Sequence, residues 1–155
     1  MPSKHLLIVY HSKTGGTRRL VEAAVEGARD PAIEGVACRV CAALEATPAD
    51  VRWADALLIG TPENFGYMSG ALKHFFDSIY YECLEHTQGL PYALLIKAGN
   101  DGRGALAAIE RIVTGLAWRR VAEPLVVRGD IVAGNVEASR ELGMTLAAGL
   151  EAGLF

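Results

Sequence analysis

The sequence predicts an α/β domain in which a parallel sheet lies between two layers of helices. Three runs of continuous apolar residues indicate strands that are covered on both faces: KHLLIVY at 4–10, ALLIG at 56–60 and YALLI at 92–96. Segments with helical spacing of apolar residues follow the strands, so that strand and helix alternate along the chain. This alternation is typical of parallel sheets with right-handed helical crossovers.

The elements are delimited by turn residues and by changes in apolar spacing. Asp30-Pro31 ends the first helix, because proline disfavours helical backbone in the residue before it. A helix from about Ser69 to Cys83 carries apolar residues at three- and four-residue spacings. The expected order is strand 4–10, helix 18–29, strand 35–41, helical turn 48–53, strand 56–60, loop 61–67, helix 69–83, strand 92–96, loop 99–104, helix to 118, strand 124–127 and helix 136–149.

Length and composition indicate one domain over residues 1–155. The chain has 155 residues, of which 51% are apolar and 21% charged, and its net charge is −3. This charge gives no general attraction to nucleic acid. No apolar run reaches the roughly 20 residues of a membrane span, and the first residues do not resemble a signal peptide. We therefore expect a cytoplasmic protein without a membrane span or nucleic-acid partner.

The cysteines and histidines do not indicate a metal site or a disulfide framework. Cys38 and Cys41 match C-x-x-C, but they fall in an expected strand, where residues three apart point to opposite faces. Structural thiols are therefore favoured over a redox pair or metal ligands. His11 and His74 belong to no His/Glu cluster with ligand spacing, and His74 is expected to be a surface or packed helix residue, so no metal is expected.

The loop after the first strand has the composition of a phosphate-binding turn. Ser12, Thr14 and Thr17 offer hydroxyl groups, and Gly15 and Gly16 let backbone N–H groups approach an anion. The helix that follows adds unpaired N–H groups and a favourable dipole. The loop contains neither G-x-x-x-x-G-K-[ST] nor G-x-G-x-x-G. The residues alone leave two interpretations open, a phosphate site or an ordinary turn with a helix cap.

Two motifs together resemble those of flavin-binding proteins. Tyr10-x-Ser12-x-Thr14-Gly15-x-Thr17 is similar to the phosphate loop of flavodoxins. The segment 62–73, P-x-x-F-G-x-M-S-G-x-x-K, resembles the strand-3 loop and helix of flavodoxin-like NAD(P)H-dependent FMN and quinone reductases. The resemblance implies a flavodoxin-like three-layer sandwich, with a five-stranded parallel sheet in the order 2-1-3-4-5, and FMN as cofactor. In such sheets, of which flavodoxin is itself a standard example, ligands bind beyond the carboxyl ends of the strands, where the strand order reverses.

The resemblance also implies cofactor contacts position by position. The first loop would hold the phosphate, the second would border the isoalloxazine ring, and the third, residues 97–104, would wrap its pyrimidine side. The third loop of this chain also offers two cations, Lys97 and Arg103, and two interpretations stay open for them: a charge near the pyrimidine side or side chains that point into solvent. Without the resemblance, Phe65 could be an ordinary core residue and the third loop a simple connection. The implied contacts are Ser12, Lys13, Thr14, Gly15, Gly16 and Thr17 for the phosphate, Pro62, Glu63, Asn64, Phe65, Gly66 and Tyr67 for the ring, and Ala98, Gly99, Asn100 and Gly102 for the pyrimidine side.

The favoured function is an FMN-dependent oxidoreductase that passes electrons from NADH or NADPH to a quinone or similar acceptor. We name no catalytic acid or base, because the flavin accepts the hydride itself. The alternative is a flavodoxin-type electron carrier without its own NAD(P)H-dependent turnover, which the modest net charge of −3 and a third loop without Trp or Tyr disfavour. A flavin-binding interaction module is a third hypothesis.

Three further expectations concern a rejected class of protein, the partners and the assembly. A signalling receiver domain is rejected, because Tyr10-His11 and Gly60-Thr61 stand where it needs acidic side chains. The expected partners are a small-molecule electron donor and acceptor. The resemblance also allows a homo-oligomer, since related reductases are commonly dimers or tetramers.

Overall fold

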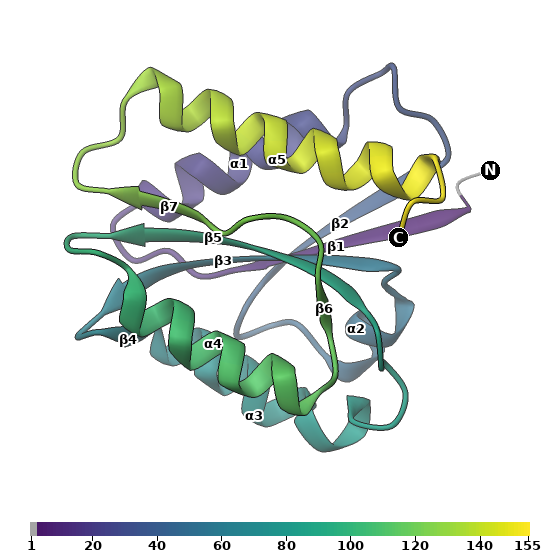
Figure 1. The fold of residues 1–155 in the computed structure, drawn as a ribbon, viewed down its shortest axis with the longest axis horizontal. Coiled ribbons are helices and arrows are strands. Elements are labelled where there is room, and N and C mark those ends of the chain that lie inside the picture. The colour runs from purple at the N-terminus through teal and green to yellow at the C-terminus, as the bar shows by residue number, and fades with distance from the viewer. Residues whose placement is uncertain (1–2) are drawn as a thin grey trace.

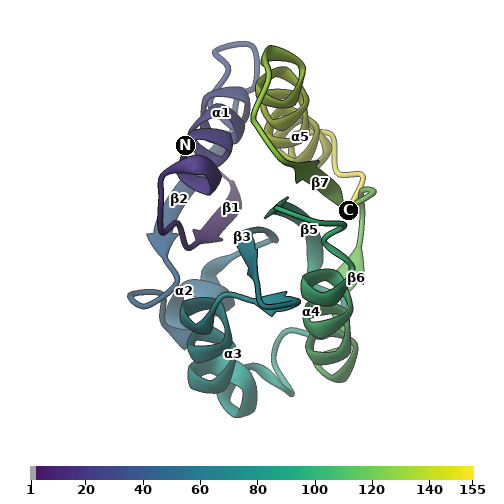
Figure 2. The same ribbon diagram turned by 90° about the vertical axis from the view of Figure 1, so that its left-hand side faces the viewer.

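The structure is a computed structural model that describes residues 3–155, and its strands form one sheet with helices on both faces (Figure 1). Helices α1 and α5 cover one face, and α2, α3 and α4 cover the other (Figure 2). The strands are β1 (Lys4–Tyr10), β2 (Val36–Ala42), β3 (Ala56–Asn64), β4 (Tyr67–Met68), β5 (Pro91–Ala98), β6 (Arg119–Arg120) and β7 (Leu125–Arg128). The helices are α1 (Gly16–Ala28), α2 (Pro48–Trp53), α3 (Gly70–Cys83), α4 (Arg103–Gly115) and α5 (Ala133–Glu151).

The order of the strands confirms the predicted 2-1-3-4-5 arrangement and the three-layer architecture. The parallel strands run β2-β1-β3-β5, and β6 and β7 share the fifth position beside β5. In this register Val9 lies between Cys41 and Ile59. Because β2 and β3 flank β1 on opposite sides, the strand order reverses between β1 and β3, and a ligand site is expected at their carboxyl ends.

The fifth strand position is divided in two, whereas the sequence predicted one strand over 124–127. Arg119–Arg120 pairs with the start of β5, and Leu125–Arg128 pairs with its end. Pro124 lies between the two pieces and has no N–H group to donate to a ladder, so the pairing is interrupted there.

The second predicted loop is a β-hairpin instead of an irregular connection. Strand β3 continues past the predicted Gly60 to Asn64, which pairs with Tyr67 of β4. The two turn residues, Phe65 and Gly66, have φ angles of 53° and 71°. Positive φ at both central residues is what a type I′ turn requires. The sequence did not indicate this turn, because phenylalanine is uncommon at positive φ.

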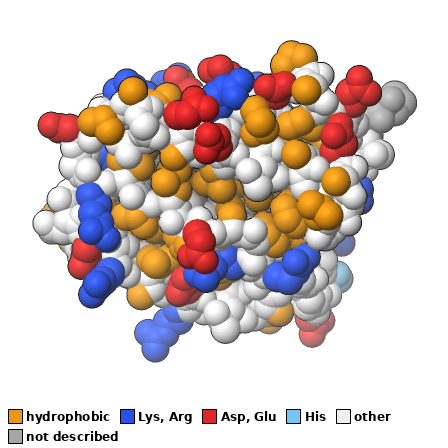
Figure 3. Space-filling model, turned by 45° about the horizontal axis from the view of Figure 1, so that its top comes forward, with side chains coloured by type: hydrophobic (Ala, Val, Ile, Leu, Met, Phe, Trp, Pro, Cys, Tyr) orange, Lys and Arg blue, Asp and Glu red, His pale blue; other side chains and the backbone are white. Residues whose placement is uncertain are grey.

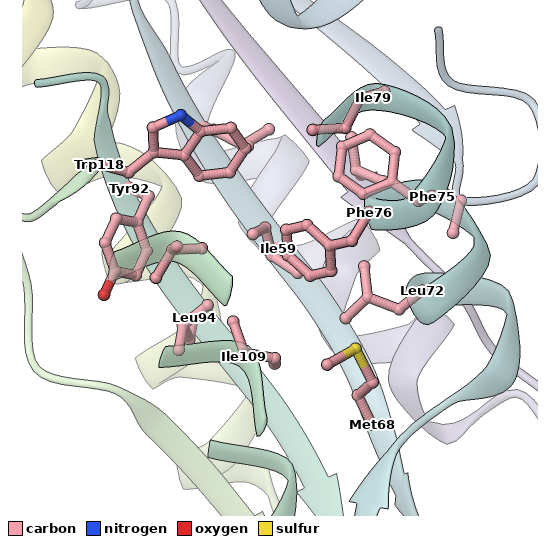
Figure 4. Packing of buried hydrophobic residues seen from close by; sticks show 14 of the residues in the cluster. Ile59, Met68, Leu72, Phe75, Phe76, Ile79, Tyr92, Leu94, Ile109 and Trp118 are labelled. Atoms are coloured by element: carbon pink, nitrogen blue, oxygen red, sulfur yellow. The ribbon is translucent and has the colours of Figure 1, made fainter. Parts of the chain in front are cut away.

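The core consists of two apolar clusters, one on each face of the sheet. Figure 4 shows residues of the cluster under α3 and α4, where the rings of Phe76 and Trp118 lie 6.2 Å apart. Helix α4 ends at Gly115, before the predicted Trp118, whose buried indole N–H donates to Thr87 Oγ1 at 2.8 Å.

Cys38 and Cys41 lie on opposite faces of β2, as predicted. Cys38 packs against the cluster under α1 and α5, and Cys41 packs against the other cluster. Burial raises the pKa of both thiols, so neither has the lowered pKa of a reactive cysteine. His74 is exposed on α3, also as predicted. Within residues 3–155, no helix combines the length and apolar character that a membrane crossing requires.

Candidate functional site

The three loops singled out in the sequence lie at one edge of the sheet. They follow β1, β3 and β5, which are adjacent and parallel, so their carboxyl ends meet at the same edge. This edge lies on the left in Figure 1 and faces the viewer in Figure 2. The fold therefore brings together residues that are more than 80 positions apart in the sequence, such as Ser12 and Ala98.

Ser12 organises the first loop. Its Oγ accepts hydrogen bonds from the backbone N–H groups of Gly15 and Arg18, each at 3.2 Å. Gly15 precedes α1 with a φ of 97°, a conformation that favours glycine, and a Cβ placed there would meet nothing within 4 Å. The side chain of Ser12 therefore fills the inside of the loop, whereas the space beside Gly15, the open side of the loop, is free of other protein atoms.

The open side of this loop presents unused hydrogen-bond donors. Within the described residues, no hydrogen bond uses the backbone N–H groups of Lys13, Thr14, Gly16 or Thr17. Two of these groups belong to the first turn of α1, where the helix dipole favours an anion. Backbone donors converging at a helix start are the chemistry that holds a phosphate.

Thr17 has the burial expected of a phosphate ligand. The residue is only 2% exposed, and no hydrogen bond involves its hydroxyl. No fully buried side-chain oxygen or nitrogen within residues 3–155 lacks a hydrogen-bond partner, so the 2% of Thr17 that is exposed includes its Oγ1. The residues present fit a phosphate group, because this loop offers a hydroxyl and several backbone N–H groups that no hydrogen bond among the described residues uses.

The hairpin of β3 and β4 holds an aromatic ring out in solvent. Phe65 is fully exposed at the tip of the turn, in the left-handed φ region that costs a non-glycine residue about 1 kcal/mol or more. The structure thus excludes Phe65 as a core residue. A strained, exposed aromatic side chain at the same edge of the sheet as the first loop is suited to contact a planar ring.

Two contacts fix this hairpin to the start of α4. Glu63 Oε2 accepts a hydrogen bond from the backbone N–H of Ala105 at 3.1 Å, in the first turn of a helix whose N-cap residue, Gly102, has no side chain to accept one. The backbones of Gly66 and Gly104 touch so closely that a Cβ on Gly104 would lie 1.8 Å from the Gly66 carbonyl oxygen. The second and third loops therefore form one unit, and the Glu63 carboxylate is directed at α4.

The other side of the hairpin is held by two buried hydroxyl residues that the sequence analysis did not single out. Thr61 Oγ1 accepts a hydrogen bond from Ser69 N at 3.1 Å, and Ser69 Oγ accepts one from Leu72 N at 3.2 Å. Ser69 is the N-cap of α3. A serine directly before a helical apolar pattern is the signal that could have identified this cap.

The third loop contributes backbone and small side chains. Gly99 and Asn100 are exposed, Gly102 turns the chain into α4 with a φ of 73°, and Ala98 is buried in the core cluster. Arg103 is also exposed, with its guanidinium 3.8 Å from the Asp101 carboxylate. The loop has the small, flexible composition that lets a ligand approach the backbone.

Lys97 lies beside the first loop, although the sequence led us to consider it as a cation of the third loop. Its side chain is on the α1 side of the sheet, where Cγ and Cε would each lie 3.7 Å from a Cβ placed on Gly16. Ile131, between β7 and α5, reaches the same place, with Cδ1 3.6 Å from that position. The sequence analysis missed Ile131, although β7, if parallel, must also end at this edge.

Tyr67 lies on the side of the hairpin that faces a groove beside α4. It lines a groove of about 640 Å³ between α3 and α4, together with Lys73, Arg111 and small residues of α4. Lys73 Nζ is 2.6 Å from Asp77 Oδ1, and this hydrogen bond raises the pKa of the lysine. No group of three or more His, Cys, Asp or Glu side chains in the described chain could hold a metal ion.

Comparisons with known proteins agree with this fold and show the family of the chain. Residues 22–133 match the sequence profile of the family described as "NADPH-dependent FMN reductase". This match includes the second and third loops, and it begins after the first. The chain belongs to this family, and it is an FMN-binding flavoprotein with a flavodoxin-like fold.

Some relatives of the chain are named flavodoxin and others are named NAD(P)H dehydrogenase (quinone). The chain is 35% identical over 109 residues to a "Flavodoxin" of Aquifex aeolicus, covering 70% of this chain and 58% of that protein. It is 33% identical over 96 residues to an "NAD(P)H dehydrogenase (quinone)" of Geobacter sulfurreducens, covering 48% and 47% of the two chains. The chain thus spans about half the length of these curated relatives.

Solved structures resemble the whole chain in fold. A flavodoxin from the domain Archaea has a TM-score of 0.81 at 18% identity, covering 95% of this chain and 99% of that one. A flavodoxin, WrbA-like protein from Agrobacterium tumefaciens has a TM-score of 0.77 at 22% identity, covering 97% and 99%. At these identities the likeness concerns the fold alone.

Proposed function

We propose that the chain is an FMN-dependent NAD(P)H oxidoreductase whose acceptor is a quinone or a similar small molecule. The observation that carries the proposal is the open third loop, KAGNDGRG at 97–104, which has no aromatic side chain to cover a flavin. Membership of a family described as NADPH-dependent FMN reductases supports it, as do relatives named as quinone-dependent NAD(P)H dehydrogenases. A ring left uncovered is accessible to small donors and acceptors.

In this proposal the chain holds and orients the cofactor. Ser12, Thr17 and the backbone N–H groups of residues 13–16 bind the phosphate, while the hairpin 62–67 borders the ring. Backbone of residues 98–100 and 102 adjoins the pyrimidine side. Bound FMN supplies hydride acceptance and electron transfer, so no side chain is assigned as acid or base. The Glu63 contact with Ala105 and the Gly66 contact with Gly104 keep the hairpin in place.

Several broader assignments accompany the proposal. Residues 1–155 would form one flavin-binding domain, and the partners would be a small-molecule donor and acceptor. A cytoplasmic location and a homo-oligomer remain predictions from the sequence and its resemblance.

The proposal is tested by mixing the FMN-loaded protein anaerobically with NADH or NADPH. We expect the visible flavin absorption to be lost with at least one nucleotide and to return when a quinone such as menadione is added. Steady-state oxidation of the same nucleotide should then depend on the quinone concentration. Dithionite reduction of the same sample serves as the control for a competent flavin.

One specific observation favours the electron carrier as the second candidate. The relative that matches over 70% of the chain is named a flavodoxin. If dithionite reduces the bound flavin but neither nucleotide does, the carrier replaces the reductase.

A further inference from the structure

We propose that Lys97 is a specificity-determining residue that selects the phosphorylated flavin, by placing a positive charge at the first loop. The inference rests on the proposed assignment of the phosphate to residues 12–17, and it does not depend on the proposed reductase activity. It concerns one side chain at the end of β5, a strand remote in sequence from the loop that it accompanies.

The position of Lys97 follows from the alternation of β5. Ile96 and Ala98 pack in the cluster under α3 and α4, so Lys97 between them faces the layer of α1 and α5. At the carboxyl end of the strand this direction leads to Gly16, the first residue of α1. The lysine stem passes beside Gly16, as the 3.7 Å distances of Cγ and Cε from a Cβ position there show.

Gly16 and Ile131 give the lysine stem a defined place. Gly16 has no side chain, and Ile131 Cδ1 lies 3.6 Å from the same Cβ position, so the half-buried methylene groups of Lys97 and the side chain of Ile131 both lie beside Gly16. The ammonium group is one bond beyond Cε and thus lies close to the start of α1. Lys97 is in this respect unlike Lys13, which is exposed on the loop itself.

The charge of Lys97 is unbalanced within the described protein. None of the ion pairs among residues 3–155 involves Lys97, whereas Arg18 is paired with Glu22 and Arg103 with Asp101. A helix start carries a partial positive charge, so a cation beside it is unfavourable on its own. The lysine and the unused N–H groups of Gly16 and Thr17 therefore converge on a position that an anion would stabilise. A phosphate with a double negative charge meets this requirement, and a neutral ribityl hydroxyl does not.

The experiment compares FMN with riboflavin, which lacks only the phosphate. Dissociation constants of both are measured by flavin fluorescence on the full chain after flavin removal, for the wild type and for Lys97→Met. Methionine retains an unbranched apolar stem of similar length and removes the charge. We expect FMN affinity to fall about tenfold or more, the effect of losing a charge-assisted hydrogen bond, and riboflavin affinity to stay within about twofold.

Three further variants make the result specific. Lys97→Arg should keep most of the preference for FMN, because it keeps the charge. Lys4→Met, the same change at the opposite end of the sheet, should alter neither affinity. Lys97→Gln serves as the second neutral variant if the methionine protein fails to fold, as judged by circular dichroism. High salt should reduce the FMN preference of the wild type more than that of Lys97→Met.

Equal loss of FMN and riboflavin affinity in Lys97→Met, or unchanged FMN affinity, would overturn the assignment of Lys97. The variant Thr17→Val shows whether only the assignment of Lys97 is wrong or whether the phosphate does not bind at residues 12–17 at all. If Thr17→Val loses FMN preference and Lys97→Met does not, the loop binds the phosphate without help from the lysine. If neither variant loses it, the phosphate lies elsewhere.

Discussion

Thr17 combines two properties at the residue scale. Its methyl side packs in the buried layer near Val21 and Gly60, while its hydroxyl is left for the open side of the first loop. A buried threonine whose hydroxyl has no partner in the protein is costly unless water or a ligand supplies one. This single residue is therefore the most direct link between the packing of α1 and the binding of the cofactor phosphate.

Thr17→Val should weaken FMN binding about ten- to hundredfold, because it removes one hydroxyl from a charged phosphate and keeps the side-chain shape. Riboflavin affinity should not change. Fluorescence titration of both flavins measures this, with Thr17→Ser as the control that keeps the hydroxyl. A parallel loss for riboflavin would mean that Thr17 acts through the loop fold and not through the phosphate.

At the scale of elements, the hairpin of β3 and β4 depends on α4 for its position. The two are joined where the backbone of Gly66 meets that of Gly104, and where Glu63 caps the helix. Only glycine fits at position 104, because a Cβ would lie 1.8 Å from a carbonyl oxygen. The packing of the start of α4 against the hairpin thus fixes the position of the exposed Phe65 side chain.

Gly104→Ala should displace the hairpin from α4 and weaken binding of FMN and riboflavin alike, by about tenfold or more, since both share the ring. Forcing an extra methyl group into close packing typically costs about 1–3 kcal/mol. Gly70→Ala is the matched control, because a Cβ at Gly70 meets nothing within 4 Å. If Gly104→Ala changes only the FMN affinity, the hairpin does not border the ring.

Helix α2 carries a pH-dependent contribution to stability. Burial opposes ionisation of Asp50, but hydrogen bonds from Thr47 and Arg39 outweigh it and hold the pKa of this carboxyl below its usual value. A carboxyl whose pKa is lower in the folded state stabilises the fold above the unfolded pKa of about 3.9. The contribution is lost as the pH falls through the lower folded-state pKa.

Asp50→Asn should therefore reduce the free energy of unfolding by about 1 kcal/mol at neutral pH, the usual size of a capping effect. The difference from wild type should shrink as the pH falls below about 4. Urea unfolding at a series of pH values measures it. Glu123→Gln, at an exposed residue without a hydrogen-bond partner among residues 3–155, should show no such trend. A difference that is constant from neutral to acid pH would contradict the ionic origin.

On the scale of the whole molecule, α1 packs against α5, a helix more than 100 residues away in the sequence. Their backbones approach at two glycines, because a Cβ on Gly143 would lie 1.8 Å from Ala24 O, and one on Gly27 would lie 1.9 Å from Arg140 O. Arg140 adds ion pairs to Glu26 and Asp30. On the face shown in Figure 3, basic and acidic side chains are interspersed, which accords with the net charge of −3.

Gly143→Ala should destabilise the protein by about 1–3 kcal/mol, because the added methyl group forces the two helices apart. Gly134→Ala lies in the same helix but faces open space, so it should be neutral or stabilising through its higher helix propensity. Thermal and urea unfolding compare the two variants. Equal stability of both variants would contradict the close approach of α1 and α5.

The features of this protein that depend on local chemistry were predictable from the amino-acid sequence alone. Apolar runs such as KHLLIVY identified buried strands, helical spacing identified α3, and hydroxyl and glycine residues marked the first loop. These signals lie within short windows, so they can be read without knowing which segments meet. The strand order and the cofactor needed the resemblance as well, because periodicity contains no information on which strands are neighbours.

The contacts between distant residues at the site follow from the packing of the folded chain and were not predictable from the sequence. Lys97 lies beside Gly16, Glu63 caps α4, and Ile131 reaches the first loop from beyond β7. Each contact depends on the register and direction of parallel strands, which bring the ends of remote segments to one edge. The turn at Phe65 likewise depends on the pairing of Asn64 with Tyr67 and on the helix behind it. A positive φ at phenylalanine is unfavourable locally, so only the surrounding contacts can impose it.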